Sequence, residues 1–230
     1  QTVLLSISGL AIFGGCLLLL FVKNGPYRKK GTSLDLTICF KLFKNNPFRK
    51  ASFGYFGHMW ELYTFWAFVP ILLKTYSELY TTVQFNIPLL SFCVIGIGSI
   101  ACVLGSYLAK KYGTKKIAFY CLLLSGMCCL IAPFFFMVEN ETIFILFLLF
   151  WGMVVIADSP LFSTLVAENA PENDKGAALT IVNCIGFSIT ILSIQLISIL
   201  FHSTSSNFIF LLLAIGPVSG LLAIGTKKGL

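Results

Sequence analysis

The sequence predicts an all-α membrane protein with seven transmembrane helices. Hydrophobic residues make up 57% of the 230 residues and charged residues only 11%, and the mean hydropathy is +0.92. Soluble domains average about 45–50% apolar and about 25% charged residues, so this chain cannot cover a water-facing surface with polar groups. Its apolar residues also form segments of helical length, unlike the alternating pattern of about ten residues in a membrane β-barrel.

Seven segments are long and apolar enough to cross the hydrocarbon core as helices, which takes roughly 20 residues. They are Val3–Val22, Ala51–Leu73, Ile87–Ala109, Ile117–Val138, Thr142–Ala167, Ala177–Phe201 and Asn207–Gly225. The positions of Lys and Arg orient these spans, because fifteen of the sixteen fall on one side and Lys74 alone falls on the other. The positive-inside rule then predicts a multi-pass protein of the cell membrane with a cytoplasmic C-terminus. This bias accounts for most of the net charge of +7, so no nucleic-acid partner is implied.

The loop between the first two spans, residues 23–50, is the longest and carries eight basic residues. Thr32–Asp35 resembles a helix capping box. Leu34, Ile38 and Leu42 then recur at i, i+4 and i+8, a spacing typical of one apolar helix face. We expect a short amphipathic helix along the inner membrane surface. A disordered basic loop is the alternative.

Small residues and prolines mark two further spans. Ser91, Gly98 and Gly105 repeat every seven residues on the third span, which favours close contact with another helix. Pro160 directly follows Asp158–Ser159 in the fifth span, where it could free backbone carbonyls. The eight cysteines show no metal-ligand spacing, so we expect them to be packing residues and expect no metal or cofactor.

Only three ionisable side chains fall inside the predicted spans: His58, Glu61 and Asp158. A charged group at the bilayer centre costs at least a few kcal/mol, so each should face the protein interior or a water-filled cavity. At 1.5 Å per residue, Glu61 lies about 16 Å, His58 about 12 Å and Asp158 about 14 Å from the inner end of its span. The matching depths predict one polar site built from the second and fifth spans.

His58 and Glu61 are three residues apart, so they share a helix face. The same face holds Gly54 and Phe65. A buried histidine beside carboxylates can change its charge near neutral pH, which suits proton coupling, and His58 could alternatively bind an anionic substrate. A simpler interpretation is that Glu61 only pairs with His58 and fixes the rotation of the helix.

The chain resembles the C-terminal part of a major facilitator superfamily transporter. The long basic loop followed by six spans matches the family's central loop and helices seven to twelve. GSYLAKKYGTKK at Gly105–Lys116 resembles the family's G-x-x-x-(A)-D-R-x-G-R-R loop between helices eight and nine, although Lys110 replaces the acid. Arg49–Pro70 and Val154–Pro171 resemble the H-x-W-E-x-Y seventh helix and the A-D-S-x-x-F-S tenth helix of a bacterial nitrate/nitrite-porter-like group.

The resemblance implies a domain organisation. Residues 1–22 would be the last transmembrane helix of an N-terminal half, residues 23–50 a cytoplasmic interdomain linker, and residues 51–230 a C-terminal six-helix bundle. The chain begins with Gln1 rather than Met, and we expect the natural protein to start earlier. The N-terminal half of the same protein is then an expected partner, together with the lipid bilayer and a small-molecule or ion substrate.

The resemblance also implies where the substrate passes, because the family's first, fourth, seventh and tenth helices line a central cavity. His58, Glu61 and Asp158 would then serve transport and proton coupling. The expected lining residues are Gly54, Tyr55, Phe65, Trp66 and Ser159. Transport would proceed by alternating access, a rocking of one half against the other.

Two other functional classes are weaker interpretations. Seven spans with a cytoplasmic C-terminus also fit a stand-alone receptor or rhodopsin-like protein, but the last span contains no lysine for a retinal Schiff base. We expect no enzyme activity, because the sequence shows neither a metal-ligand cluster nor a convincing nucleophile–base pair. The residues fit organic anions, amphipathic drugs and small inorganic ions about equally as substrates.

Overall fold

The computed structural model describes residues 2–22, 38–204 and 207–225, and the regular structure within them is helical. The chain divides into two compact units, Gln1–Leu36 and Thr37–Leu230. The first unit contains the helix α1 (Thr2–Phe21), whose sequence is apolar on every side. A helix of this kind is typical of a membrane span.

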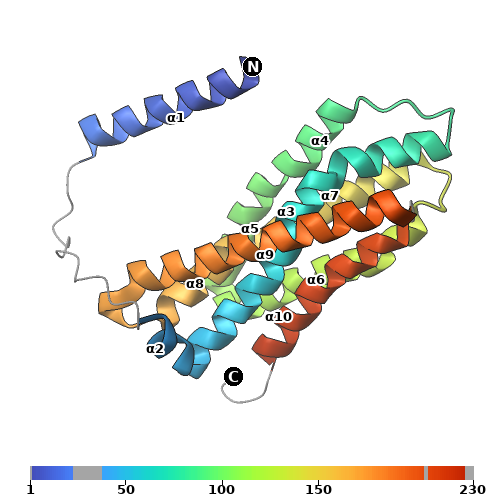
Figure 1. Ribbon diagram of the computed structural model, residues 1–230. Coiled ribbons are helices and arrows are strands. Elements are labelled where there is room, and N and C mark those ends of the chain that lie inside the picture. The colour runs from blue at the N-terminus through green and yellow to red at the C-terminus, as the bar shows by residue number, and fades with distance from the viewer. Residues whose placement is uncertain (1, 23–37, 205–206, 226–230) are drawn as a thin grey trace. The chain divides into compact units, whose positions relative to one another are not determined.

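The second unit is a bundle of helices, several of which are interrupted (Figure 1). Its elements in order are α2 (Ile38–Lys44), α3 (Asn46–Leu79), α4 (Ile87–Gly96), α5 (Gly98–Tyr112), α6 (Thr114–Phe135), α7 (Glu141–Ala157), α8 (Ser159–Asn169), the 3₁₀ helix η1 (Glu172–Asp174), α9 (Lys175–Thr204), the 3₁₀ helix η2 (Asn207–Ala214) and α10 (Ile215–Gly225).

Six stretches of the described chain are long and apolar enough to cross a membrane, and they match six of the seven predicted spans. They are α1, α4 with α5, α6, α7 with α8, η1 with α9, and η2 with α10. The predicted span Ala51–Leu73 lies within α3, which is not one of the six. His58, Glu61 and several tyrosine and tryptophan residues lower the hydropathy of this helix.

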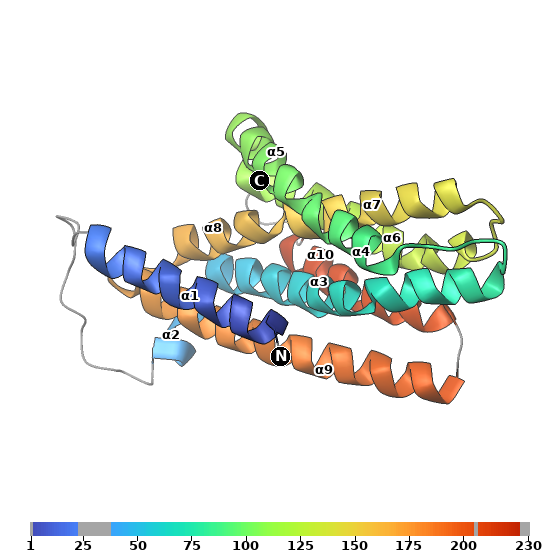
Figure 2. The ribbon, with the colours of Figure 1, turned by 90° about the horizontal axis from the view of Figure 1, so that it is seen from above.

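Helix α3 is the central helix of the bundle, and it packs most extensively against α10 and α9 (Figure 2). Of its 34 residues, 18 are buried, so its environment is mainly protein. The helix begins five residues before the predicted span, because Asn45 caps it by accepting a hydrogen bond from the backbone N–H of Phe48. Pro47 occupies the first turn, where a missing N–H costs nothing.

Part of the predicted amphipathic helix is helical, over the residues of α2, while Thr32–Asp35 and Leu34 lie outside the described residues. Its position at the inner membrane surface stays a prediction. Leu42 is only 3% exposed and belongs to the apolar core. Phe43 lies against Phe48 with a distance of 5.5 Å between the ring centroids. The apolar side of α2 therefore packs on the bundle, chiefly on α3 and α9.

The small residues predicted to allow close helix contact lie between α4, α5 and α7. Ser91, Gly98 and Gly105 are all buried. A Cβ atom on Gly105 would stand 3.0 Å from the backbone carbonyl oxygen of Ala157, a contact that leaves no room for a larger side chain. The span that contains these residues is interrupted between α4 and α5, which the sequence analysis did not predict.

The predicted connection Lys110–Lys116, between the third and fourth spans, is almost entirely helical. Helix α5 continues to Tyr112 and α6 begins at Thr114, so Gly113 alone connects them. Gly113 has a φ of 94°, a conformation that favours glycine because it has no Cβ. The connection is therefore shorter than the predicted residues 110–116, because a single residue of this kind can join two helices.

Candidate functional site

The core of the bundle falls into two apolar clusters along α3, and the three ionisable side chains lie at their boundary. One cluster includes α3 residues up to Met59 and the other begins at Leu62. His58 and Glu61 are each 1% exposed and Asp158 is 0% exposed. A polar layer thus crosses an otherwise apolar core, and the three side chains that the sequence singles out form part of it.

A close helix crossing holds α3 in place beside this layer. Gly57 of α3 and Gly216 of α10 face each other, and a Cβ atom on either glycine would collide with the backbone carbonyl oxygen of the other. Helix packing this close fixes both the depth and the rotation of α3. The backbone contact between Gly57 and Gly216 therefore positions the turn of α3 that carries His58.

His58 and Asp158 meet across two helices. The Nδ1 atom of His58 lies 2.9 Å from Oδ1 of Asp158. The rings of Tyr55 and Phe162 flank the imidazole, each with its centroid 6.1 Å away. The Nε2 atom of His58 and both carboxyl oxygens of Asp158 have no hydrogen bond of good geometry among the described residues. The pair is thus held by a close contact between the imidazole and the carboxyl group, and its polar atoms are otherwise without partners among the described residues.

Glu61 does not contact His58 by a hydrogen bond or ion pair that the structure shows, and three neutral donors from other helices surround its carboxyl group instead. Trp151 donates from Nε1 to Oε1 at 2.8 Å, and the thiol of Cys129 approaches the same oxygen at 3.1 Å. Ser125 donates from Oγ to Oε2 at 2.9 Å. The interpretation that Glu61 merely pairs with His58 does not describe this arrangement.

The contacts of Ser125 can serve both charge states of Glu61. A serine hydroxyl has one hydrogen, and Oγ of Ser125 lies within reach of two acceptors: Oε2 of Glu61 at 2.9 Å and the carbonyl oxygen of Leu122 at 3.1 Å. When Glu61 is ionised, Ser125 donates to the carboxylate. When Glu61 carries a proton, Oε2–H can donate to Ser125, which then donates to Leu122. Rotation of one hydroxyl group therefore satisfies either state.

Asp158 lies in a break between two helices, beside Pro160, where we expected backbone carbonyls to be freed. Helix α7 ends at Ala157 and α8 begins at Ser159, with Asp158 between them. Proline has no N–H and cannot bond to the carbonyl four residues earlier, here that of Ile156. The thiol of Cys102, on α5, approaches this carbonyl oxygen at 3.5 Å. The break is thus partly compensated by a donor from the neighbouring helix.

Polar side chains also join α3 to α9, close to the same layer. Thr64 donates to Ser193, which donates in turn to the backbone carbonyl of Trp60, at 2.8 and 2.7 Å. Thr190 donates to the carbonyl of Met59 at 3.0 Å. These bonds hold α9 against the turn of α3 that contains His58 and Glu61. The sequence analysis did not identify Thr190 and Ser193.

The structure places the five predicted lining residues in two environments. Gly54, Tyr55 and Phe65 are buried inside the bundle, and Trp66 and Ser159 are half-buried. Tyr55 lies beside His58, while Phe65 lies against Trp151, the donor to Glu61, with 4.4 Å between ring centroids. Trp66 instead contacts Tyr63, at 5.3 Å. None of these contacts tests whether the residues line a transport pathway.

Sequence reasoning missed the donors Ser125, Cys129 and Trp151. Cys129 was interpreted as a packing residue, and it is completely buried. One signal was available, because Ser125 and Cys129 are four residues apart and so share a helix face. Trp151 precedes Asp158 by seven residues and therefore lies on the same side of the fifth span. These spacings indicate which side chains share a helix face, but not that they face Glu61.

The comparison with protein families gives one match. The model of the Major Facilitator Superfamily matches residues 1–194, which include α1 and most of the bundle. The comparison with curated proteins gives no match. The family match does not support a receptor or rhodopsin-like protein. The chain is a multi-pass helical membrane protein that belongs to the major facilitator superfamily, a family of transporters and not of enzymes.

Proposed function

We propose that this protein is a proton-coupled secondary transporter of a small solute and that Glu61, His58 and Asp158 carry the coupling. The observation that supports this most directly is the buried polar layer, in which Glu61 has hydrogen-bond partners suited to both of its charge states. A group that must gain and lose a proton inside the membrane needs such partners, because an unsatisfied buried charge is costly.

We further propose that α3 is a seventh span and that the C-terminus is cytoplasmic. With 34 residues the helix is about 51 Å long at 1.5 Å per residue, more than the roughly 30 Å of the hydrocarbon core. Its polar residues need not oppose insertion in the folded protein, since more than half of the helix is covered by other helices. The predicted orientation rests on the one-sided distribution of Lys and Arg.

Alternating access would supply the route to the buried layer. His58, Glu61 and Asp158 are at most 1% exposed, so protons can reach them only when helices move. The breaks between α4 and α5 and between α7 and α8 are places where such motion costs few helical hydrogen bonds. The expected partner in this motion is the N-terminal half of the same protein, with residues 23–50 as the linker.

The substrate class remains a prediction from the sequence. The resemblance to a nitrate/nitrite-porter-like group makes nitrate a reasonable first solute to test, followed by small organic anions. His58 could contribute an unused donor or acceptor at Nε2. The proposal does not depend on which of these solutes is carried.

The test is solute-driven proton movement in proteoliposomes. The intact protein is reconstituted with the pH-sensitive dye pyranine inside, and nitrate or an organic anion is added outside. The proposal predicts a change of internal pH that is reduced at least about tenfold in Glu61→Gln and Asp158→Asn, because neither amide can exchange a proton in this range. Glu78→Gln is the matched control, since Glu78 is 65% exposed on the same helix and pairs with Lys74.

Two results would separate the parts of the proposal. Solute uptake without any pH change, in a folded protein, would contradict proton coupling while leaving transport intact. Normal pH changes in both Glu61→Gln and Asp158→Asn would remove these carboxyl groups from the mechanism. Equal losses in Glu78→Gln would show that the assay reports folding rather than proton transfer.

A further inference from the structure

Aromatic side chains gather on the surface where α3 and α9 pack side by side. Tyr63 and Trp66 lie on α3 with 5.3 Å between their ring centroids, and the ring of Phe187, on α9, lies 5.5 Å from that of Tyr63. Asn183 precedes Phe187 by four residues, so it lies on the same side of α9. Tyr63 and Trp66 are half-buried, while Phe187 and Asn183 are exposed. We call these four residues the aromatic surface.

The aromatic surface lies beside the buried polar layer. Tyr63 packs against both apolar clusters of the core, and His58 and Glu61 lie at the boundary of these clusters. At 1.5 Å per residue, Tyr63 lies about 20 Å and Trp66 about 24 Å from the inner end of the predicted span. Both are therefore inside a hydrocarbon core about 30 Å thick, whereas tyrosine and tryptophan are usually enriched at its two interfaces with water.

Lipid is an unsuitable neighbour for this surface. Tyr63 contacts its neighbours through its ring, and its hydroxyl has no hydrogen-bond partner among the described residues. The amide of Asn183 is exposed about 10 Å inside the sixth predicted span. Hydrocarbon neither donates nor accepts hydrogen bonds, so polar groups left unsatisfied there are costly. The hydroxyl and the amide therefore need a polar partner from outside the described residues.

The aromatic surface carries no charge. The two predicted spans that form it, Ala51–Leu73 and Ala177–Phe201, contain no Lys, Arg or Asp, and their ionisable residues His58 and Glu61 are buried. A small inorganic anion such as nitrate therefore has no exposed cationic partner here. Aromatic rings favour contact with the face or edge of another ring, and hydroxyl and amide groups can donate to an acceptor. These properties suit a flat, uncharged aromatic molecule that carries a hydrogen-bond acceptor.

We propose that the aromatic surface binds the transported solute and that this solute is a planar, uncharged aromatic molecule with a hydrogen-bond acceptor. The rings of Tyr63, Trp66 and Phe187 contact the ring of the solute, and Asn183 donates to its acceptor. Trp66 loses no hydrogen bond when its ring turns toward the solute, because its indole N–H has no partner among the described residues. This inference rests on the transport function proposed above and specifies its substrate class.

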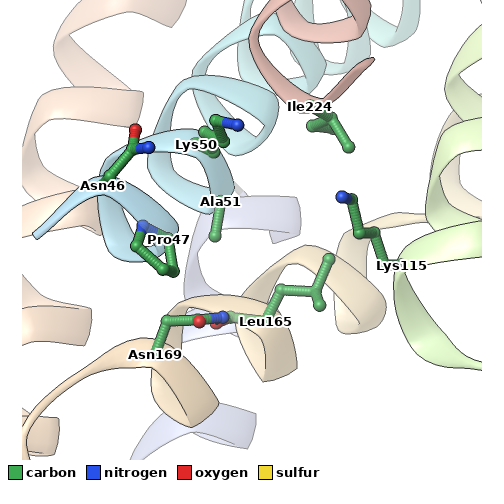
Figure 3. Close-up of a pocket in the computed structure, with 8 residues that line it drawn as sticks. All are labelled: Asn46, Pro47, Lys50, Ala51, Lys115, Leu165, Asn169 and Ile224. Carbon is green, nitrogen blue, oxygen red and sulfur yellow. The ribbon is translucent and has the colours of Figure 1, made fainter. Parts of the chain in front are cut away.

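The cavity at the end of the bundle where α3 and α6 begin is a different place (Figure 3). Its volume is about 320 Å³, and its lining contains no aromatic side chain. Ala51, which belongs to this lining, lies about 18 Å along α3 from Tyr63. An aromatic solute has ring partners at the aromatic surface and none in this cavity.

Equilibrium binding to the intact protein in detergent tests the proposal. The probe is radiolabelled benzamide, a flat uncharged ring with an amide acceptor, and binding to protein-free micelles is subtracted. Cyclohexanecarboxamide carries the same amide on a puckered ring that cannot stack, so it should compete at least about tenfold less well. Nitrate should not compete.

Two double variants locate the binding site. Tyr63→Leu/Trp66→Leu should bind benzamide at least about tenfold more weakly, because each lost aromatic contact lowers affinity about two- to tenfold. Tyr120→Leu/Phe134→Leu is the matched control, since it removes two exposed aromatic side chains from α6, and it should bind benzamide as the parent protein does.

A third variant keeps the test decisive if Tyr63→Leu/Trp66→Leu does not fold. Asn183→Leu/Phe187→Leu changes two exposed positions of α9, where substitutions usually have little effect on folding. It must weaken benzamide binding at least about fivefold, because it removes one ring contact and one hydrogen-bond donor. Unchanged binding in this variant overturns the proposal.

Three further results would also overturn it: no binding of benzamide, equal competition by cyclohexanecarboxamide, or equal losses in Tyr63→Leu/Trp66→Leu and its control. The first of these is also the result expected if another helix of the intact protein covers the aromatic surface permanently.

The binding assay and the proton assay can fail separately. Benzamide binding without any solute-driven pH change would contradict proton coupling and leave the aromatic site standing. A nitrate-driven pH change in a protein that does not bind benzamide would support the proposed function and overturn this inference.

Discussion

Glu61 and Asp158 are both buried carboxyl groups in one polar layer, but their partners differ in kind. Glu61 receives hydrogen bonds from an indole, a thiol and a hydroxyl on two other helices. Asp158 has one close partner, His58, and neither of its carboxyl oxygens has a hydrogen bond of good geometry among the described residues. The partners of Glu61 are three neutral donors, whereas the partner of Asp158 is an imidazole, which has two ring nitrogens that can donate or accept.

Under the proton coupling proposed above, this difference assigns different tasks to the two carboxyl groups. We call the three donors Ser125, Cys129 and Trp151 the cage around Glu61. The cage can accommodate Glu61 with or without its proton while the helices stay in place, because only the hydroxyl of Ser125 has to turn. The contact between His58 and Asp158 joins α3 to the break between α7 and α8, so a change of its charge acts on how these helices pack. The following variants test the comparison, beginning with the largest expected effect.

Removing the imidazole should have the largest effect. In His58→Ala, Asp158 is left buried without its partner, and breaking a buried pair in this way costs about 3–5 kcal/mol. The expected fall in Tm is about 10 °C for a chain of this size, measured by thermal unfolding in detergent with a thiol-reactive dye. His202→Ala is the control, because His202 is exposed near the end of α9. A fall below about 2 °C would show that Asp158 does not depend on His58.

A double variant sharpens this result. In His58→Leu/Asp158→Leu both polar groups are gone, and replacing a buried pair by apolar residues is often neutral. The double variant should therefore be more stable than His58→Ala. If it is less stable, the surrounding core needs the polar pair for its packing.

Two substitutions of Glu61 should differ from each other. Leucine leaves the indole N–H of Trp151 and the thiol of Cys129 buried without an acceptor, which costs about 2–3 kcal/mol. Glutamine keeps an acceptor for both and can donate to Ser125, so its stability should stay within about 1 kcal/mol of the parent protein. Chemical denaturation of the two variants checks the difference. Equal stabilities would mean that the cage contributes little.

Replacing one donor of the cage should have a moderate effect. Trp151→Phe removes the N–H that bonds to Glu61 but keeps an aromatic ring against Phe65, and the expected loss is about 2 kcal/mol. Trp66→Phe is the control, because the indole N–H of Trp66 has no hydrogen-bond partner among the described residues. Similar losses in both variants would show that ring volume, rather than the hydrogen bond, is the cause.

The smallest effect is expected at the helix break beside Asp158. Cys102→Ala removes the thiol that approaches the carbonyl of Ile156 at 3.5 Å, a long and weak contact. The loss of stability should be below about 1 kcal/mol, and Cys102→Ser should recover it. A larger loss in both variants would indicate that the cysteine acts through packing.

The sequence was sufficient for the broad architecture because lipid imposes simple rules on composition and length. Six predicted spans match helices of the structure, and the break expected near Pro160 is present at Asp158. The ionisable residues could be found because each is an exception in an apolar segment. Their partners could not, since Ser125, Cys129 and Trp151 are ordinary residues in a membrane helix until their distances to Glu61 are known.

Helix ends were also predicted less well than helix positions. The extension of α3 to Asn46 depends on a side-chain cap by Asn45, and the merging of α5 and α6 into a one-residue connection depends on the backbone of Gly113. The cap and the positive φ of Gly113 are details of local geometry, and hydropathy does not measure them. The pairing of His58 with Asp158, rather than with Glu61, depends on the rotation of α3, which its glycine contact with α10 determines.

The low hydropathy of α3 has a consequence for how the protein is made. During synthesis each span enters the bilayer from the translocon largely on its own hydrophobicity, and α3, the proposed seventh span, carries His58 and Glu61, which oppose this step. Its main packing partners include α10, which ends at Gly225 and is completed 146 residues after Leu79. At about 5–20 residues per second, that interval lasts roughly 7–30 s. The helix that carries the polar layer is thus the one most in need of protection, by the insertion machinery or by earlier helices, until the chain is complete.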